Sequence, residues 1–293
     1  MLRQPDLGII LSTWAGDPLP WIGVVLAAVL YLVAVRIVDR AHPANRVPRW
    51  RIAAWLAGVA AIAIALVSAV DVYAGRLFSV HMVQHLLLSM VAPPLLALGA
   101  PMTLALRAAS PRVRRSVLLA VLHSWPVRTV SWPPVGWIVF AVAMWATHFS
   151  PLFNAALENH ALHSVEHLIY LVAGVLFWWP LIAADPMRWR LSPIGRMAYL
   201  AAQMPFNTAV GLAIYFAPGI LYPHYALIGR TWGPDPLTDQ QIAGIVMWGL
   251  GDVILLSALV LAVEAWLRAD ERRSRRTRER AARDVERASV EGG

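Results

Sequence analysis

Cysteine and lysine are both absent from this sequence of 293 residues, and charged residues make up only 14% of it. Without cysteine the chain can form neither disulfide bonds nor thiolate metal sites. Soluble domains average about 25% charged residues, so the scarcity of charge excludes a typical soluble protein. All 25 basic residues are arginine, which together with abundant alanine is typical of a GC-rich bacterial genome. The net charge of +8 does not indicate a nucleic-acid partner, because nine arginines follow Trp266, where a basic tail contacts membrane lipids.

Hydrophobic residues, by contrast, form 59% of the chain and give a mean hydropathy of +0.58. Seven apolar runs are long enough to cross about 30 Å of hydrocarbon, so we expect an all-α integral membrane protein, a bundle of seven transmembrane helices. The first run begins only near Trp21, and we expect no cleavable signal peptide. We assign residues 1–267 to one membrane domain and residues 268–293 to an Arg/Glu-rich cytoplasmic tail. The expected spans lie at about 21–38, 52–70, 82–106, 133–149, 162–184, 196–217 and 241–267.

The arginines alternate between the segments that flank and join these spans. From the amino terminus onward these segments carry one, five, one, five, no, three, one and nine arginines. Because positive charge accumulates on the cytoplasmic side, we expect the amino terminus outside and the carboxyl terminus in the cytoplasm. Residues 112–125 are basic and too short to span, so they are expected to form an interfacial helix. Pro93 and Pro94 fall inside the third span, where a neighbouring helix or water must satisfy the backbone groups that they free.

Two pairs of histidines, each four residues apart, stand where membrane helices are expected to begin. His81 and His85 occur in HMVQHLLL, and His163 and His167 occur in HSVEHLIYL. Ionisable side chains in membrane segments are rare and mark functional sites by default. Residues four apart lie on one face of a helix, about 5–6 Å apart at Cβ, so both imidazoles of a pair can approach one ion. Under the expected topology both pairs and His148 lie at the outer face.

The absence of thiolates narrows the choice of metal. Neutral imidazole suits copper, zinc, iron and nickel, and thioether sulfur selects Cu(I), so histidines together with Met82 and Met144 favour copper. Glu166 directly precedes His167 and is expected to orient an imidazole by accepting a hydrogen bond. Asp71, at the end of the second span, is expected at the same face.

Asp252 lies about twelve residues into the seventh span, about 18 Å from its start. A carboxylate at this depth can bind a cation or relay a proton. It can equally well be a neutral acid that holds helices together through hydrogen bonds, for example to Gln203 or Asn207. The sequence leaves both interpretations open.

Two stretches of the sequence resemble the polytopic CtaG-type cytochrome c oxidase assembly factors. They are HMVQHLLLSMVAPPLLALGAP and THFSPLFNAALENHALHSVEHLIYLVAGVLFWWPLI, and they cover the third to fifth spans. The order of features carries the resemblance: a His-x-x-x-His entry, a Pro-Pro kink, a second entry with adjacent Glu and His, and a Trp-Trp-Pro exit. With the seven-span layout the likeness extends over about residues 15–267.

The resemblance implies a non-enzymatic, multi-pass protein of the bacterial cytoplasmic membrane that is needed to make an active haem–copper oxidase. It further implies that copper is bound at the outer face and passed to oxidase subunits or to another copper carrier. Membrane lipids are the other expected partners. Carried over residue by residue, the histidine positions of the family correspond to His81, His85, His148, His163 and His167.

Three other functions remain open. A copper permease would continue inward from the histidines through Met144, Met204, Met247 and Asp252. Membrane di-iron enzymes also cluster histidines, but their histidine boxes face the cytoplasm and contain adjacent His-His pairs, which this chain lacks. The last alternative is haem ligated by imidazoles of the third and fifth spans.

Overall fold

The computed structural model describes residue 4 and residues 6–291, and no strand occurs among them. The expected all-α fold is therefore confirmed. Five long helices are α2 (Pro18–Ala41), α3 (Arg49–Val67), α11 (Pro133–His148), α13 (His160–Ile182) and α14 (Pro193–Tyr215). Two further helical runs each contain a π-helical turn. The first run consists of α5 (Phe78–Leu86), η1 (Leu87–Val91), α6 (Ala92–Leu98) and α7 (Pro101–Ala108). The second run consists of α16 (Pro236–Ile245), η3 (Val246–Leu250) and α17 (Gly251–Glu291).

Short helices form most of the connections. The expected helix at residues 112–125 is present as a broken series that begins at Pro111, whereas the helix between α11 and α13 was not expected. The short elements are α1 (Leu7–Ser12), α4 (Ala69–Ala74), α8 (Pro111–Val113), η2 (Arg114–Leu118), α9 (Leu119–Leu122), α10 (Trp125–Val130), α12 (Pro151–Glu158) and α15 (Pro223–Leu227).

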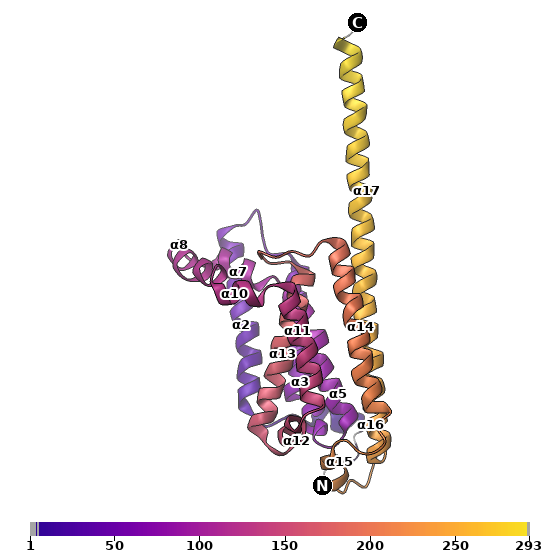
Figure 1. The fold of residues 1–293 in the computed structure, drawn as a ribbon. Helices are drawn as coiled ribbons and strands as arrows, with labels where there is room; N and C mark the ends of the chain where they lie inside the picture. Colours follow the sequence, from indigo (N-terminus) through magenta and orange to yellow (C-terminus); the bar gives the residue numbers. More distant parts are fainter. Residues whose placement is uncertain (1–3, 5, 292–293) are drawn as a thin grey trace.

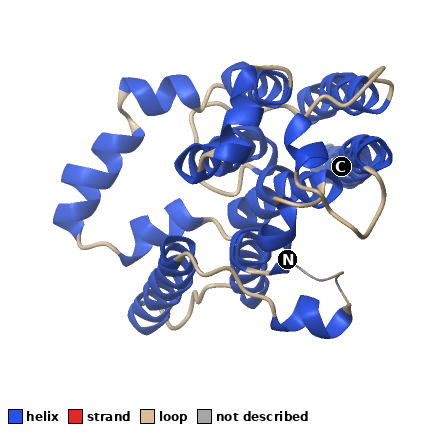
Figure 2. Cartoon of the chain, turned by 90° about the horizontal axis from the view of Figure 1, so that it is seen from below, coloured by secondary structure: helices blue, strands red, loops and turns tan. Residues whose placement is uncertain are grey.

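The long helices run side by side, and α17 projects far beyond them at one end (Figure 1). Helices α7, α8 and α10 lie at that end, whereas α12 and α15 lie at the opposite end. Viewed from below, the series of short helices at the left arches away from the bundle (Figure 2). The two ends of the bundle are therefore built differently, and the predicted histidine site belongs to the α12 and α15 end.

Five helices are long and apolar enough to cross a membrane, so the chain is a membrane protein. Helix α11 has only 16 residues and joins α12 at a bend of 70°, and this pair adds a sixth candidate. Helix α14 is not among the candidates, and it carries the buried polar side chains of Gln203 and Asn207. Each expected span has a helix, but the count of seven and the orientation of the termini stay predictions. Residues 1–267 and 268–293 are joined by the unbroken α17.

Proline begins many of these helices. Proline stands at one of the first two positions of α2, α7, α11, α12, α14 and α16, where its missing N–H would have no partner in any case. Asp17, Ser150, Ser192 and Asp235 cap four of these helices by accepting hydrogen bonds from backbone N–H groups. The high proline content therefore sets helix starts and does not conflict with a helical fold.

The backbone carbonyl that Pro93 leaves without a donor accepts a hydrogen bond from a neighbouring helix, as the sequence predicts. Because Pro93 has no N–H, the carbonyl of Ser89 lacks its usual helical donor. The indole Nε1 of Trp178, on α13, donates a hydrogen bond of 3.2 Å to that carbonyl. Gly174, one turn earlier on α13, lies so close that a Cβ there would be 2.6 Å from the Ser89 oxygen. This contact fixes α13 against η1 and α6.

Candidate metal centre

The two histidine pairs predicted from the sequence meet between α5 and α13. The Nε2 atoms of His81 and His85 are 2.8 Å apart, and both side chains are fully buried. The ring centroids of His81 and His163 are 5.2 Å apart. The close packing of α13 on η1 and α6 brings these side chains together across helices.

Two more imidazoles extend this group. The ring of His167 is 4.1 Å from that of His163, and the ring of His148, on α11, is 5.7 Å from that of His85, both measured between centroids. All five predicted histidines are thereby linked by ring contacts. The histidine cluster is defined as these five side chains together with Glu166: His81, His85, His148, His163, Glu166 and His167.

Glu166 faces the α5 histidines. Its Oε2 atom lies 3.9 Å from His81 Nε2 and 4.0 Å from His85 Nε2. Ligand atoms of Glu166, His81 and His163 all lie within 4.8 Å of one another. Atoms bound to one ion at 2.0–2.1 Å are at most about 4.2 Å apart, and Glu166 Oε2, His81 Nε2 and His85 Nε2 already meet this limit. Glu166 is therefore positioned to be a ligand, whereas the sequence suggested that it orients an imidazole.

Six buried atoms of the cluster have no hydrogen-bond partner within the described residues. Buried polar groups are nearly always paired, because an unpaired one costs about 1–3 kcal/mol. A single cation would satisfy several of these atoms at once, so the donor set fits a metal ion. The atoms are His85 Nδ1, His148 Nε2, His163 Nε2, His167 Nε2 and both carboxylate oxygens of Glu166.

Hydrogen bonds from outside the cluster fix the tautomers of two histidines. The hydroxyl of Tyr225 donates to the carbonyl of Ala74 at 3.0 Å and lies 3.1 Å from His81 Nδ1. A phenol has one proton, so it accepts from His81 Nδ1–H and leaves Nε2 as a lone pair. Burial raises the pKa of Tyr225, which keeps that proton in place. His148 Nδ1 lies 2.7 Å from the carbonyl of Met144, so this nitrogen also carries the proton and Nε2 is free.

The first turn of α5 is held by a carboxylate from the far end of the sequence. Asp239, on α16, is fully buried and accepts hydrogen bonds from the backbone N–H groups of Phe78 and Ser79 at 2.7 and 3.3 Å. A guanidinium nitrogen of Arg230 lies 3.7 Å from Asp239 and donates to the carbonyl of Arg76. These bonds tie α16 and the segment before it to the turn that carries His81.

Phe153, on α12, covers the cluster. Its ring centroid lies 5.0 Å from that of His81, 6.1 Å from that of His85 and 5.7 Å from that of His148. The Phe153 side chain is fully buried. The short helix that follows the bend after α11 therefore supplies an apolar cover over three of the five imidazoles.

Three other residues predicted near the site lie in its surroundings. Met82 and Met144 are buried in the main apolar core, which also includes Phe153. Asp71 belongs to α4 and accepts a hydrogen bond of 2.8 Å from the amide of Gln84. Burial raises the pKa of Asp71, and the bond from Gln84 lowers it in part. Gln84 in turn donates to the carbonyl of Ala65, so Asp71 connects α4 and α3 to α5.

Asp252 lies in the first turn of α17, directly after the π-helical turn η3. Its carboxylate accepts a hydrogen bond of 2.9 Å from the amide of Asn207 and another from the hydroxyl of Thr208, both on α14. Each carboxylate oxygen thus has a donor. This geometry matches the helix-linking role that the sequence left open, with Asn207 as the partner.

Sequence reasoning missed the residues that position the cluster. Tyr225, Asp239 and Phe153 come from connections or helix starts that carry no metal-ligand spacing. Tyr170 stacks on His85 at 3.9 Å between ring centroids. Its position one helical turn after His167 is a spacing from which the sequence could have placed it near the cluster. The others become neighbours of the cluster only through tertiary packing.

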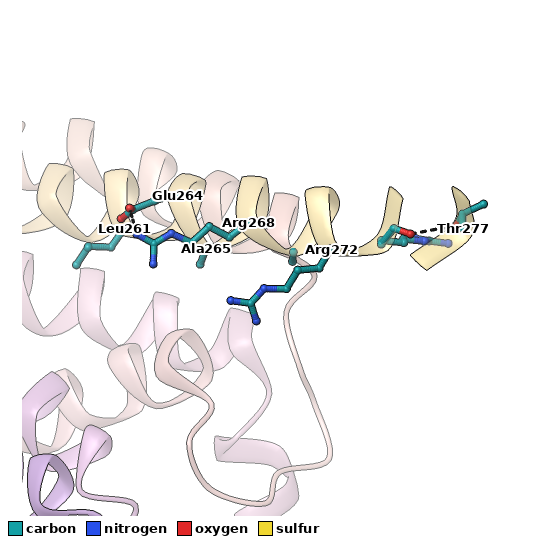
Figure 3. A pocket seen from close by; sticks show the side chains of 8 residues that line it. Leu261, Glu264, Ala265, Arg268, Arg272 and Thr277 are labelled. Carbon is teal, nitrogen blue, oxygen red and sulfur yellow. Dashed lines mark hydrogen bonds and ion pairs between the residues drawn. The ribbon is translucent and has the colours of Figure 1, made fainter. Parts of the chain in front are cut away.

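A large surface hollow lies elsewhere, beside α17 (Figure 3). Every residue that lines it belongs to that one helix, including Glu264 and Arg268, which form an ion pair. Because none of its lining residues comes from another element, the hollow is the open flank of a projecting helix. It contributes nothing to the histidine cluster.

Comparisons with known proteins identify the family of this chain. The chain is 32% identical over 277 residues to uncharacterized proteins of Mycobacterium bovis and Mycobacterium tuberculosis, and 30% identical to one of Mycobacterium leprae. These alignments cover 92% of this chain but only 42% of each relative, so the chain spans about two fifths of their length. No solved structure matches. The family described as cytochrome c oxidase caa3 assembly factor matches residues 29–269, a range that includes the whole histidine cluster, and the chain belongs to this family.

Proposed function

We propose that this protein binds a copper ion in the histidine cluster and delivers it to a haem–copper oxidase during assembly. The observation that carries the proposal is the convergence of buried nitrogen and oxygen atoms that lack any partner within the described residues. Because the chain belongs to a family of oxidase assembly factors, a haem–copper oxidase is the proposed recipient of the copper. The role is that of a carrier and not of an enzyme.

Copper fits this donor set best among the common metals. Imidazole ligands bind divalent first-row metals with an affinity that peaks at copper. The chain has no thiolate, so the cluster cannot hold Cu(I) as a cysteine-based chaperone does. Glu166 supplies a hard oxygen ligand that suits Cu(II) more than Cu(I). Zinc is the nearest competitor, and metal analysis distinguishes the two.

To deliver copper, the protein must release the ion from the buried histidine cluster. Phe153 is the apolar cover over His81, His85 and His148, and it stands on the short helix α12. We infer that α12 moves away from α5 when the ion is transferred. The arginine distribution supports a position of this end of the bundle on the outer side of the bacterial cytoplasmic membrane, and there an oxidase subunit or another copper carrier would receive the ion.

The test is the copper content of the client oxidase in cells. A strain without this gene should assemble oxidase that contains haem but little copper, and wild-type protein should restore the copper. A His81→Ala/His85→Ala variant should fail to restore it, whereas a His42→Ala/His123→Ala variant, which alters two histidines outside the cluster, should succeed. Normal copper in the oxidase of the deletion strain would refute the proposal.

A copper permease is the second candidate. Met82 and Met247 are both buried in the core that surrounds the cluster, and thioether groups at successive depths are what a Cu(I) path needs. A permease path that ends at Asp252 would need a free carboxylate oxygen there to bind copper. Both oxygens of Asp252 instead accept hydrogen bonds from α14. Copper uptake into proteoliposomes separates the two functions, because a carrier that acts only on one face produces none.

A further inference from the structure

A cavity lies at the end of the bundle opposite the histidine cluster. It has a volume of about 610 Å³ and is enclosed by α7, α9, α10, the last turns of α13 and the segment that follows α13. Figure 1 shows α7 and α10 at this end, whereas α12 and α15, beside the cluster, lie at the other. The cavity is within the usual size range of small-molecule sites, about 300–1,000 Å³.

The lining of this cavity is divided between apolar and basic groups. The side chains from α7, α9 and α13 are mostly apolar, with Leu106, Leu122 and Trp179 among them. The basic groups come from two places, Arg128 on α10 and Arg188 in the segment after α13. A ligand that fills the cavity must therefore combine a hydrocarbon part with an anionic part.

A hydrogen bond links the two segments that carry these arginines. The indole Nε1 of Trp189, the residue after Arg188, donates a hydrogen bond of 3.2 Å to the carbonyl of Arg128. The guanidinium of Arg188 lies 5.4 Å from the centre of the Trp189 ring. Both arginines are solvent-exposed, and no carboxylate among the described residues forms an ion pair with either. Their charges are available to an external anion.

The short helices that close the cavity leave apolar surface without a protein partner. Val117 and Val121 each expose about half of their surface, and Trp125 exposes 73%. An amphipathic arm of this kind, with Arg112, Arg114 and Arg115 beside the valines, is typical of helices that lie in the headgroup region of a membrane. The cavity between this arm and the bundle is therefore open to lipid.

We propose that the cavity binds one phospholipid with an anionic headgroup. Arg128 and Arg188 bind the phosphate, and an acyl chain lies along the apolar lining from α7 and α13. Basic pockets beside membrane helices on the cytoplasmic side commonly bind anionic headgroups, and the arginine counts favour that side for this end of the bundle. The inference is independent of copper and rests on the chain being a membrane protein with this end on the cytoplasmic side.

The experiment measures lipid retention by the purified full chain in mild detergent. Native mass spectrometry should detect one bound phosphatidylglycerol, and the protein should prefer this lipid to phosphatidylcholine by about 25-fold, since the two arginines each contribute about fivefold. The Arg128→Gln/Arg188→Gln variant should lose this preference. The matched control Arg272→Gln/Arg273→Gln removes the same charge from the exposed flank of α17 and should keep it.

Two further measurements separate a lipid from other occupants. Val127→Trp fills the cavity from α10 and should abolish binding of both lipids, with thermal unfolding used to check that the variant folds. Glycerol phosphate, which carries the phosphate without acyl chains, should not displace the bound lipid. Equal retention by wild type and the Arg128→Gln/Arg188→Gln variant would overturn the proposal, and so would displacement by glycerol phosphate.

Discussion

Replacing Gly174 with alanine should disturb the histidine cluster from a distance. A Cβ at this position would lie 2.6 Å from the Ser89 carbonyl oxygen and 2.7 Å from Pro93 Cγ. Neither neighbour can rotate away, because one is backbone and the other belongs to a proline ring. The two helices must therefore separate at this point.

The required separation is large compared with what a metal site tolerates. Ordinary contact begins near 3.4 Å, so α13 must move by about 0.8 Å relative to η1 and α6. Metal–ligand distances are usually held within about 0.2 Å. Because His163 and His167 are on α13 and His81 and His85 precede η1, the displacement separates the two pairs. Overpacking of this kind also costs about 1–3 kcal/mol of folding free energy.

The assay combines thermal unfolding in detergent with copper titration of purified protein. Gly174→Ala should lower both the unfolding temperature and the copper affinity. The matched control is Gly23→Ala, in the second turn of α2, where a Cβ meets nothing within 4 Å. That variant should be as stable as wild type or slightly more so, because alanine favours a helix. If Gly174→Ala keeps wild-type stability and copper affinity, the packing argument is wrong.

Three further predictions concern residues around the cluster. Tyr225→Phe removes the acceptor that fixes the His81 tautomer and should weaken copper binding about 10–100-fold in competition titrations, whereas unchanged affinity would contradict this role. Asp239→Asn removes a fully buried charge that caps α5 and should cost about 3 kcal/mol of stability, which a thermal melt unchanged from wild type would contradict. Burial raises the pKa of Asp71, so its ionisation destabilises the folded state as pH rises above the usual value of 3.8. Asp71→Asn should therefore stabilise the protein more at pH 7 than at pH 4 in thermal melts, and an equal effect at both would refute this.

The fold was predictable to the extent that it depends on hydropathy and short spacings. Helices occur in every expected span, because long apolar runs permit no other backbone structure in lipid. The count of seven is not confirmed, since α11 is short and α14, with buried Gln203 and Asn207, is not among the candidate spans. The helix α12 was missed because eight residues between two spans have no periodicity that a sequence pattern can detect.

The candidate site was likewise predictable only where it depends on short spacings within one helix. The i,i+4 spacing identifies His81 with His85 and His163 with His167, since this geometry is local to each helix. The contact between the two pairs depends on Gly174, and the tautomers depend on Tyr225, which is 144 residues from His81. Such dependence on tertiary packing has no signature in a single sequence.

The most direct test of the central claim is the metal content of purified protein. We predict that wild-type protein loaded with excess copper and then desalted retains copper, whereas His81→Ala/His85→Ala and His163→Ala/His167→Ala each retain almost none. The control variant His42→Ala/His123→Ala should retain as much as wild type. Equal copper in all four proteins, or none in wild type, would contradict the assignment of the histidine cluster as a copper site.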